Sequence, residues 1–192
     1  MELTHHNNLT EMKQQYTAHK IILWLGIASI IMLFGGLTSA YIVRQAEGNW
    51  LIFELPFTFY ISTGLIVLSS ISMIYAVSSI KKGENQRTLW GLIATLGLGL
   101  GFMAFQLFSW QELVKQEVFF IGNPSGSFLY VISGLHLAHV IGGFIFLMIA
   151  IFKTSSGKYN SKNYSGLKLC STYWHFLDVL WVYLFVFLLI IR

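Results

Sequence analysis

Five long apolar segments, separated by short polar connections, constrain this chain more than any other feature. A helix that crosses a hydrocarbon core of about 30 Å needs roughly 20 residues. Lipid offers the backbone no hydrogen-bond partners, so each segment must satisfy its own peptide groups, as a helix does. The sequence therefore predicts an all-α fold, an integral membrane bundle of five transmembrane helices. Their expected ranges are 21–43, 57–80, 89–110, 128–152 and 172–191.

The charged residues avoid these segments. The chain has 12 Lys and Arg and 8 Asp and Glu, only 10% of its residues, whereas soluble domains carry about 25%. Asp178 alone lies inside an apolar segment. A soluble helical bundle would instead carry charge at helical spacing on every outer face. We therefore divide the chain into a polar cytoplasmic tail, residues 1–20, and a single transmembrane domain, residues 21–192.

The basic residues favour one side of the predicted membrane. Nine fall in the tail and in the second and fourth connections, and three fall on the other side. The positive-inside rule then predicts a cytoplasmic N-terminus and a periplasmic C-terminus. The net charge of +4 is explained by topology and by contacts with anionic lipid, so we expect no nucleic-acid partner. The nine are Lys13, Lys20, Lys81, Lys82, Arg87, Lys153, Lys158, Lys162 and Lys168, and the three are Arg44, Lys115 and Arg192.

Four ionisable side chains lie within the apolar segments: His136, His139, His175 and Asp178. Such groups are costly in a bilayer unless they are paired or hydrated, so each needs an explanation. The members of each pair, 136 with 139 and 175 with 178, share a helix face because they are three residues apart. Trp174, Asp178 and Trp181 form one stripe by the same spacing.

Three interpretations of these groups remain open. Histidines could ligate haem, Asp178 with His175 could relay protons or serve an antiporter, or the groups could fix the bundle geometry and dock a partner. The fourth segment enters from outside and the fifth from the cytoplasm, so we expect the two pairs at well-separated depths. That separation argues against bis-histidine haem. A single cysteine, Cys170, provides no disulfide and no cysteine cluster for a metal.

Small residues at helical spacing predict close helix packing. Gly134, Ala138 and Gly142 would form a groove two turns long on the fourth segment. The other pairs are Gly35 with Ser39 and Gly36 with Ala40 on the first segment, and Gly97 with Gly101 on the third.

Three motifs resemble a known family, subunit III of haem–copper respiratory oxidases. The run from Ser171 to Trp181 is similar to its closing signature, Y-W-H-F-V-D-V-V-W. The run from Gly134 to Gly143 resembles the family's G-x-H-x-x-H-V-I-x-G, and Gly36 to Tyr41 resembles its first-helix motif. The signature matches are Tyr173, Trp174, His175, Phe176, Asp178, Val179 and Trp181.

This resemblance implies an accessory core subunit of a proton-pumping cytochrome c oxidase in a bacterial cytoplasmic membrane. It implies haem and copper in partner subunits I and II, none in this chain, and bound phospholipid. It also implies support of proton uptake and complex stability, and it is compatible with a larger respiratory supercomplex. No catalytic or metal residue is assigned here. The candidates for subunit or lipid contact are His136, His139, Trp174, His175, Asp178, Trp181, Gly134, Ala138 and Gly142.

The chain departs from the family pattern at two positions. Ile30 stands where family members often carry a buried Glu, and Lys168 stands where another Glu is usual. We therefore carry no proton-handling role over to these positions. The longer family members also have two further helices that bound a lipid cleft, and this chain has only the five-helix part.

The sequence is also compatible with other functions. The nearest alternatives are subunit III of a quinol oxidase and a related protein associated with nitric oxide reductase. A small proton-coupled transporter is a more remote alternative, because no inverted repeat or broken helix is evident. A b-type membrane cytochrome would be recognised by a haem absorption band retained by the isolated chain.

Overall fold

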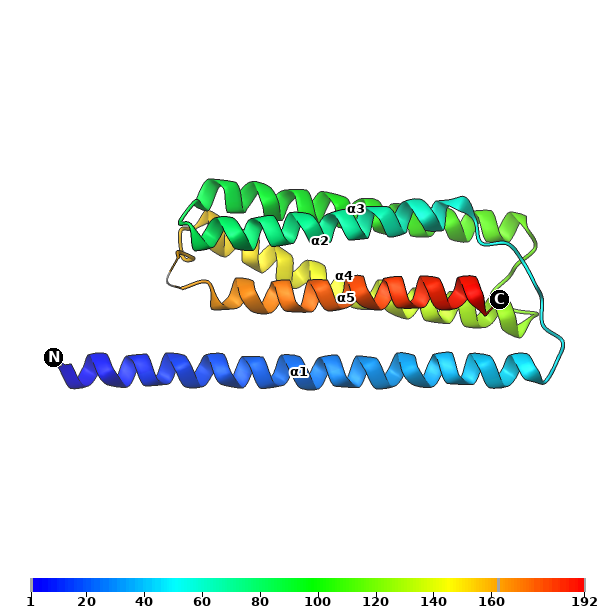
Figure 1. The fold of residues 1–192 in the computed structure, drawn as a ribbon, viewed down its shortest axis with the longest axis horizontal. Helices are drawn as coiled ribbons and strands as arrows, with labels where there is room; N and C mark the ends of the chain where they lie inside the picture. The colour runs from blue at the N-terminus through cyan, green and yellow to red at the C-terminus, as the bar shows by residue number, and fades with distance from the viewer. Residues whose placement is uncertain (1, 162, 192) are drawn as a thin grey trace.

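Five helices make up the chain in the computed structural model, which describes residues 2–161 and 163–191. Within the first helix it describes the side chains of Gln14 and of residues 16–46. The helices lie side by side as one bundle (Figure 1), and the described residues form no β-strand. Their bounds are α1 Glu2–Ala46, α2 Phe57–Lys81, α3 Asn85–Lys115, α4 Pro124–Ser155 and α5 Ser165–Ile190.

The prediction of five transmembrane helices is confirmed, since each helix is long and apolar enough to cross a bilayer. The helices extend beyond the apolar segments: α4 begins at Pro124 and α5 begins at Ser165. Asn123 caps α4, because its side-chain oxygen accepts a hydrogen bond from the backbone nitrogen of Ser125. Helix α1 begins at Glu2 and therefore includes most of the predicted polar tail.

The two ends of the bundle differ in charge. At the end that holds the α2–α3 and α4–α5 connections, Glu84 is the one acidic residue with a described side chain; we name this the basic end. The opposite end holds the α1–α2 and α3–α4 connections and is named the acidic end. The basic end carries Lys81, Lys82, Arg87, Lys153, Lys158 and Lys168, and the acidic end carries Glu47, Glu54, Glu112 and Glu117 with Arg44 and Lys115. Lys162, Arg192 and the side chain of Lys13 lie outside the described part.

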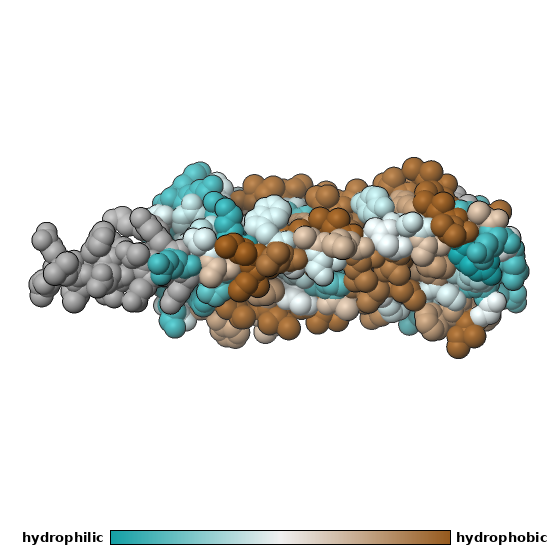
Figure 2. Space-filling model, turned by 90° about the horizontal axis from the view of Figure 1, so that it is seen from below, coloured by the Kyte–Doolittle hydropathy of each residue, from teal (hydrophilic) through white to brown (hydrophobic). Residues whose placement is uncertain are grey.

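The outer surface between these ends is apolar. Seen from the α1 side, hydrophobic residues dominate the middle of the molecule and hydrophilic residues gather at both ends (Figure 2). Large side chains such as Met32, Phe57 and Ile145 are exposed there. A soluble protein rarely exposes so large an apolar surface, whereas a lipid-facing surface requires it.

Helices α2 to α5 share one core, and α1 lies along α4 and α5 without contacting α2 or α3. The α1 face that packs carries Phe34, Thr38 and Tyr41, all buried. The hydroxyl group of Tyr183 on α5 donates to Thr38 Oγ1 at 3.2 Å, and the side-chain amide of Gln45 donates to the carbonyl oxygen of Ile191 at 2.9 Å. These contacts attach the half of α1 nearest the acidic end.

Close helix approach occurs at small residues, most of which were not predicted as packing positions. A Cβ atom at Gly91 would lie 2.9 Å from the Cβ of Ala76, and one at Gly99 would lie 3.0 Å from Trp174. On α4 the tight position is Gly143, where a Cβ would lie 3.2 Å from Leu177 Cδ1.

Of the predicted small residues, Gly101 packs closely, since a Cβ there would lie 3.3 Å from Leu65 Cδ1 on α2. The predicted small-residue surfaces of the first and fourth segments are not sites of close approach within this chain. Gly35, Gly36 and Gly97 have no neighbouring helix within 4 Å of a built Cβ, and Ala138 is exposed. Gly134 and Gly142 make only ordinary contacts, 3.8 Å from Trp110 and Tyr173. The reason is that bulky residues such as Phe34 and His136 determine which face of each helix turns inward.

Candidate functional site

The four intramembrane ionisable residues lie near the middle of their helices, and the two pairs are close in depth. The His136 ring packs on Trp181, with the ring centroids 5.0 Å apart, and Trp181 is one helical turn from Asp178. The prediction of well-separated depths is wrong. Both helices begin earlier than their apolar segments, which moves these residues from the first part of each span toward its midpoint.

His136 is fully buried among aromatic rings. Phe102 and Phe34 contact it edge-on, with centroids 5.9 and 6.5 Å away. Neither ring nitrogen has a hydrogen-bond partner among the described residues. The enclosing rings leave no room for a porphyrin beside this imidazole, so the arrangement does not fit haem ligation.

His139 lies one turn along the same helix and is partly buried. Its Nδ1 is 2.7 Å from the carbonyl oxygen of Leu135, and its ring contacts Phe34 with centroids 5.8 Å apart. The described residues contain no group of three His, Cys, Asp or Glu side chains placed to hold a metal ion.

His175 and Asp178 share a helix face but differ in burial. The hydroxyl group of Ser70 on α2 lies 2.6 Å from His175 Nδ1, whereas Asp178 Oδ2 lies 4.0 Å from that nitrogen. Asp178 is 4% exposed, and neither carboxylate oxygen has a hydrogen-bond partner in the described part of the chain. The His175 side chain remains 30% exposed.

The two signature tryptophans fasten α5 to α2. The indole nitrogen of Trp174 donates to Ser69 Oγ and that of Trp181 donates to Thr63 Oγ1, both at 3.0 Å. Both rings are buried with Asp178 on the face that the sequence predicted as one stripe. Buried indoles need such partners, so these bonds fix the rotation and register of α5 against α2.

Gln106 on α3 was missed by the sequence analysis. It is fully buried, and neither its amide oxygen nor its nitrogen has a partner among the described residues. The indole of Trp110 donates to Ser133 Oγ at 3.1 Å, and this register places Gln106 at the depth of His136. The sequence did contain a signal for it, because Gln106 is the one amide side chain within the third apolar segment.

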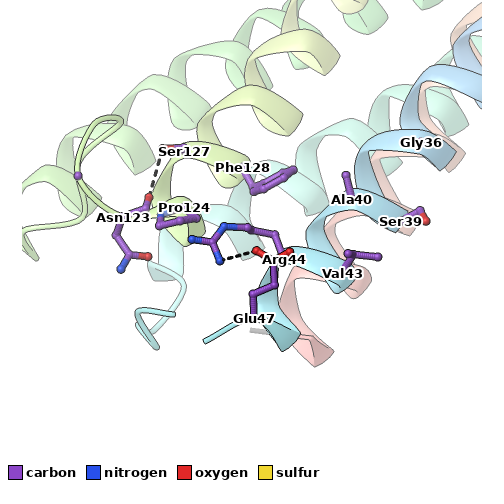
Figure 3. Close-up of a pocket in the computed structure, with 11 residues that line it drawn as sticks. Gly36, Ser39, Ala40, Val43, Arg44, Glu47, Asn123, Pro124, Ser127 and Phe128 are labelled. Atoms are coloured by element: carbon purple, nitrogen blue, oxygen red, sulfur yellow. Dashed lines mark hydrogen bonds and ion pairs between the residues drawn. The ribbon is translucent and has the colours of Figure 1, made fainter. Parts of the chain in front are cut away.

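Two grooves run beside α1. The acidic-end groove has a volume of about 820 Å³ between α1 and the start of α4 (Figure 3). Its apolar lining includes Ala40, Val43 and Phe128, and Arg44 forms an ion pair with Glu47 at 3.0 Å on its rim. The small residues Gly36 and Ser39 also line it.

The basic-end groove has a volume of about 620 Å³ between α1, the end of α4 and the start of α5. Buried residues such as Ala150 and Cys170 line it together with exposed apolar ones such as Ile22, and Lys153, Lys158 and His19 supply basic groups. Tyr159 also lines it; burial raises the pKa of its phenol, and the nearby Cys170 adds to that shift.

Comparison with known proteins finds relatives that are named as subunit 3 of an oxidase. Residues 51–191 match the family described as cytochrome c oxidase subunit III. A probable cytochrome c oxidase subunit 3 of Nocardia farcinica is 30% identical over 176 residues, covering 89% of this chain and 86% of that protein. A probable quinol oxidase subunit 3 of Staphylococcus saprophyticus is 27% identical, covering 93% and 92%. Cytochrome c oxidase subunit 3 of Bacillus sp. strain PS3 is 28% identical, covering 84% and 80%.

Proposed function

The chain belongs to the cytochrome c oxidase subunit III family, and from that membership we propose that it is an accessory core subunit of a proton-pumping terminal oxidase. Such a complex reduces O₂ to water with haem and copper held by subunits I and II. This chain would pack on subunit I, support proton uptake and stabilise the complex. The observation that carries the proposal is the family match across 51–191, which includes the two-histidine motif of residues 134–143 and the closing signature.

The interior of the bundle supports a structural role. The largest fully buried side chains include Trp174, Trp181, Phe34, Phe59 and Phe102, which fill the core around His136. Phe59 stacks on Trp181 with ring centroids 6.2 Å apart, and Phe102 meets Trp181 edge-on at 5.1 Å. A core packed in this way gives a rigid body that can brace a partner subunit.

The electron donor has two candidates. We propose cytochrome c, which the names of the Nocardia and Bacillus relatives carry. Quinol is the second candidate, because the probable quinol oxidase subunit of Staphylococcus saprophyticus aligns with 93% of this chain.

The proposal is tested by purifying the affinity-tagged chain from its native membranes in mild detergent. Mass spectrometry should find oxidase subunits I and II with it, and the absorption spectrum of the complex should show haem. Oxygen consumption with reduced cytochrome c, compared with a reduced quinol, then assigns the donor. Purification with no haem-containing partner would overturn the proposal.

We further propose that the basic end faces the cytoplasm of a bacterial cell, with the bundle in the cytoplasmic membrane. The described basic residues concentrate at that end, and the acidic end has four carboxylates against two bases. Positive residues are retained on the cytoplasmic side during insertion, which favours this orientation.

Phospholipid binding is proposed for the basic-end groove. Its apolar depth suits acyl chains, while Lys153 and Lys158 suit an anionic head group, each contributing about 1 kcal/mol. Replacing both lysines with Ala should weaken the binding of anionic phospholipid to the purified complex by roughly thirtyfold, since 1.4 kcal/mol corresponds to a factor of about ten. The control is Lys81→Ala with Lys82→Ala, which removes equal charge at the same end outside the groove. Equal retention in both variants would contradict the assignment.

A further inference from the structure

Two polar side chains at one level of the bundle are fully buried and lack a hydrogen-bond partner. Gln106 on α3 and His136 on α4 hold four of the seven buried side-chain nitrogen and oxygen atoms that have no partner in the described part of the chain. The neighbouring buried hydroxyl groups differ, because those of Ser62, Ser109 and Ser133 each bond a carbonyl oxygen of their own helix. Gln106 and His136 therefore need a partner that the helix backbone does not supply.

The register of α3 against α4 brings Gln106 to the turn of α4 that carries His136. Phe102 and Trp110 lie four residues before and after Gln106, so the three side chains share one helix face. The Phe102 ring meets the His136 ring with centroids 5.9 Å apart, and the Trp110 indole donates to Ser133 Oγ at 3.1 Å. Gln106 is thus held between two contacts with the same short stretch of α4.

The amide and the imidazole do not bond each other directly, so their polar atoms lie beyond hydrogen-bond distance. A polar separation of this kind is what a bridging water fills. The remaining surroundings of His136 are aromatic rings such as Phe34 and Trp181, which offer it no hydrogen-bond partner. Native proteins satisfy buried polar groups with ordered water where side chains and backbone do not.

We propose that a water molecule is bound between Gln106 and His136 and bridges α3 to α4 inside the membrane. Water has two donors and two acceptor sites, so one molecule can accept from the amide nitrogen and donate to the unprotonated nitrogen of a neutral imidazole. Both residues lie within six positions of the midpoints of their helices. At about 1.5 Å of rise per residue, the site lies within about 9 Å of the middle of the bundle, inside a hydrocarbon core of about 30 Å.

This water would extend the polar contact between α3 and α4. The described side-chain hydrogen bonds between these helices join Trp110 to Ser133 and Tyr130 to the carbonyl oxygen of Trp110, nearer the acidic end. The site rests on the interior of this chain alone, so another function for the protein would leave it in place.

X-ray radiolytic labelling of the full chain in lipid nanodiscs tests the site without any substitution. Radiation converts bound water to hydroxyl radicals, which oxidise the adjacent side chains. We expect mass spectrometry to find oxidation at Phe102 or His136. The control is Met73 on α2, which is also fully buried and carries a more reactive sulfur, but holds no unpartnered polar atom. No oxidation at Phe102 and His136, or equal oxidation at Met73, would overturn the proposal.

Gln106→Leu removes the amide and should lower the labelling of Phe102 and His136 severalfold. The matched control is Ser62→Ala, which removes a buried hydroxyl that is already bonded within its own helix. We expect this control to label as the wild type does. Thermal unfolding checks that each variant is folded. Unchanged labelling in a folded Gln106→Leu chain would overturn the proposal, and the wild-type measurement remains decisive if that variant fails to fold.

A double-mutant cycle tests whether the two residues share one water. Gln106→Leu and His136→Leu should each lower the melting temperature, because each leaves the other polar group buried with one fewer bond. The double variant removes both polar groups, so it should lose less than the sum of the two single losses. Additive losses would show that the two side chains have no common ligand and would overturn the bridge.

Discussion

Asp178 and His175 show how much two residues on one helix face can differ. Asp178 is enclosed in the bundle, and its carboxylate oxygens lack hydrogen-bond partners among the described residues. His175 reaches the surface and bonds Ser70 across the α2–α5 contact. Of the three interpretations open from the sequence, haem ligation does not fit this arrangement, and a proton relay and a structural role with partner docking both stay predictions.

Asp178→Asn should preserve the shape of the core while replacing the carboxyl group beside His175 with an amide. We expect early turnover of the complex to survive, because the haem and copper are expected in subunits I and II and not in this chain. The N–H groups of the amide would be buried where the carboxyl oxygens have no described hydrogen-bond partner, so retention in the complex and catalytic lifetime should fall. The measurement is the ratio of this chain to haem after gel filtration, with oxygen consumption followed over time. Complete loss of initial turnover in a fully assembled variant would contradict this prediction.

Gly166 should be intolerant of even a methyl group. A Cβ at this position would overlap the hydroxyl oxygen of Tyr159, which packs across the start of α5. We expect Gly166→Ala to destabilise the chain by about 1–3 kcal/mol, as overpacking does. Tyr159→Phe removes the overlapping oxygen, so the double variant should recover much of the loss. Thermal unfolding of the four proteins in detergent measures the coupling; additive effects would refute the contact.

At the scale of elements, the rotation of α4 decides which small residue matters. His136 and Gly143 face the core, whereas Ala138 faces outward. Gly143→Leu should therefore disrupt the isolated chain, because a Cβ there already approaches Leu177 and Trp174 to 3.2 and 3.4 Å.

Ala138→Leu is the matched substitution on the opposite face of α4. We expect it to change the stability of the isolated chain by less than about 0.5 kcal/mol, as exposed substitutions do. Any defect should appear only as a lower yield of assembled complex, which subunit stoichiometry would reveal. A loss of stability in the isolated Ala138→Leu chain would show that this face packs internally after all.

For the whole molecule, the separation of charge between the two ends predicts a fixed orientation. In a Cys170→Ala background, Gln116→Cys at the acidic end should react with a membrane-impermeant maleimide in intact spheroplasts. Ser156→Cys at the basic end should react only after permeabilisation. Both positions are exposed, so accessibility within the protein does not limit labelling. The reverse labelling pattern would invert the proposed topology.

The sequence by itself determined the five helices, because bilayer length and charge exclusion are properties of single segments. It also determined the family, through motifs that lie within those segments. Only the tertiary structure decided which residues face inward, how His136 and Trp181 meet, and that Gly91, Gly99 and Gly143 closely approach neighbouring helices. The physical reason is that every spacing pattern defines a face of a helix, but the rotation of that face is set by neighbours distant in sequence, such as Ser69 and Thr63 bonding the two signature tryptophans.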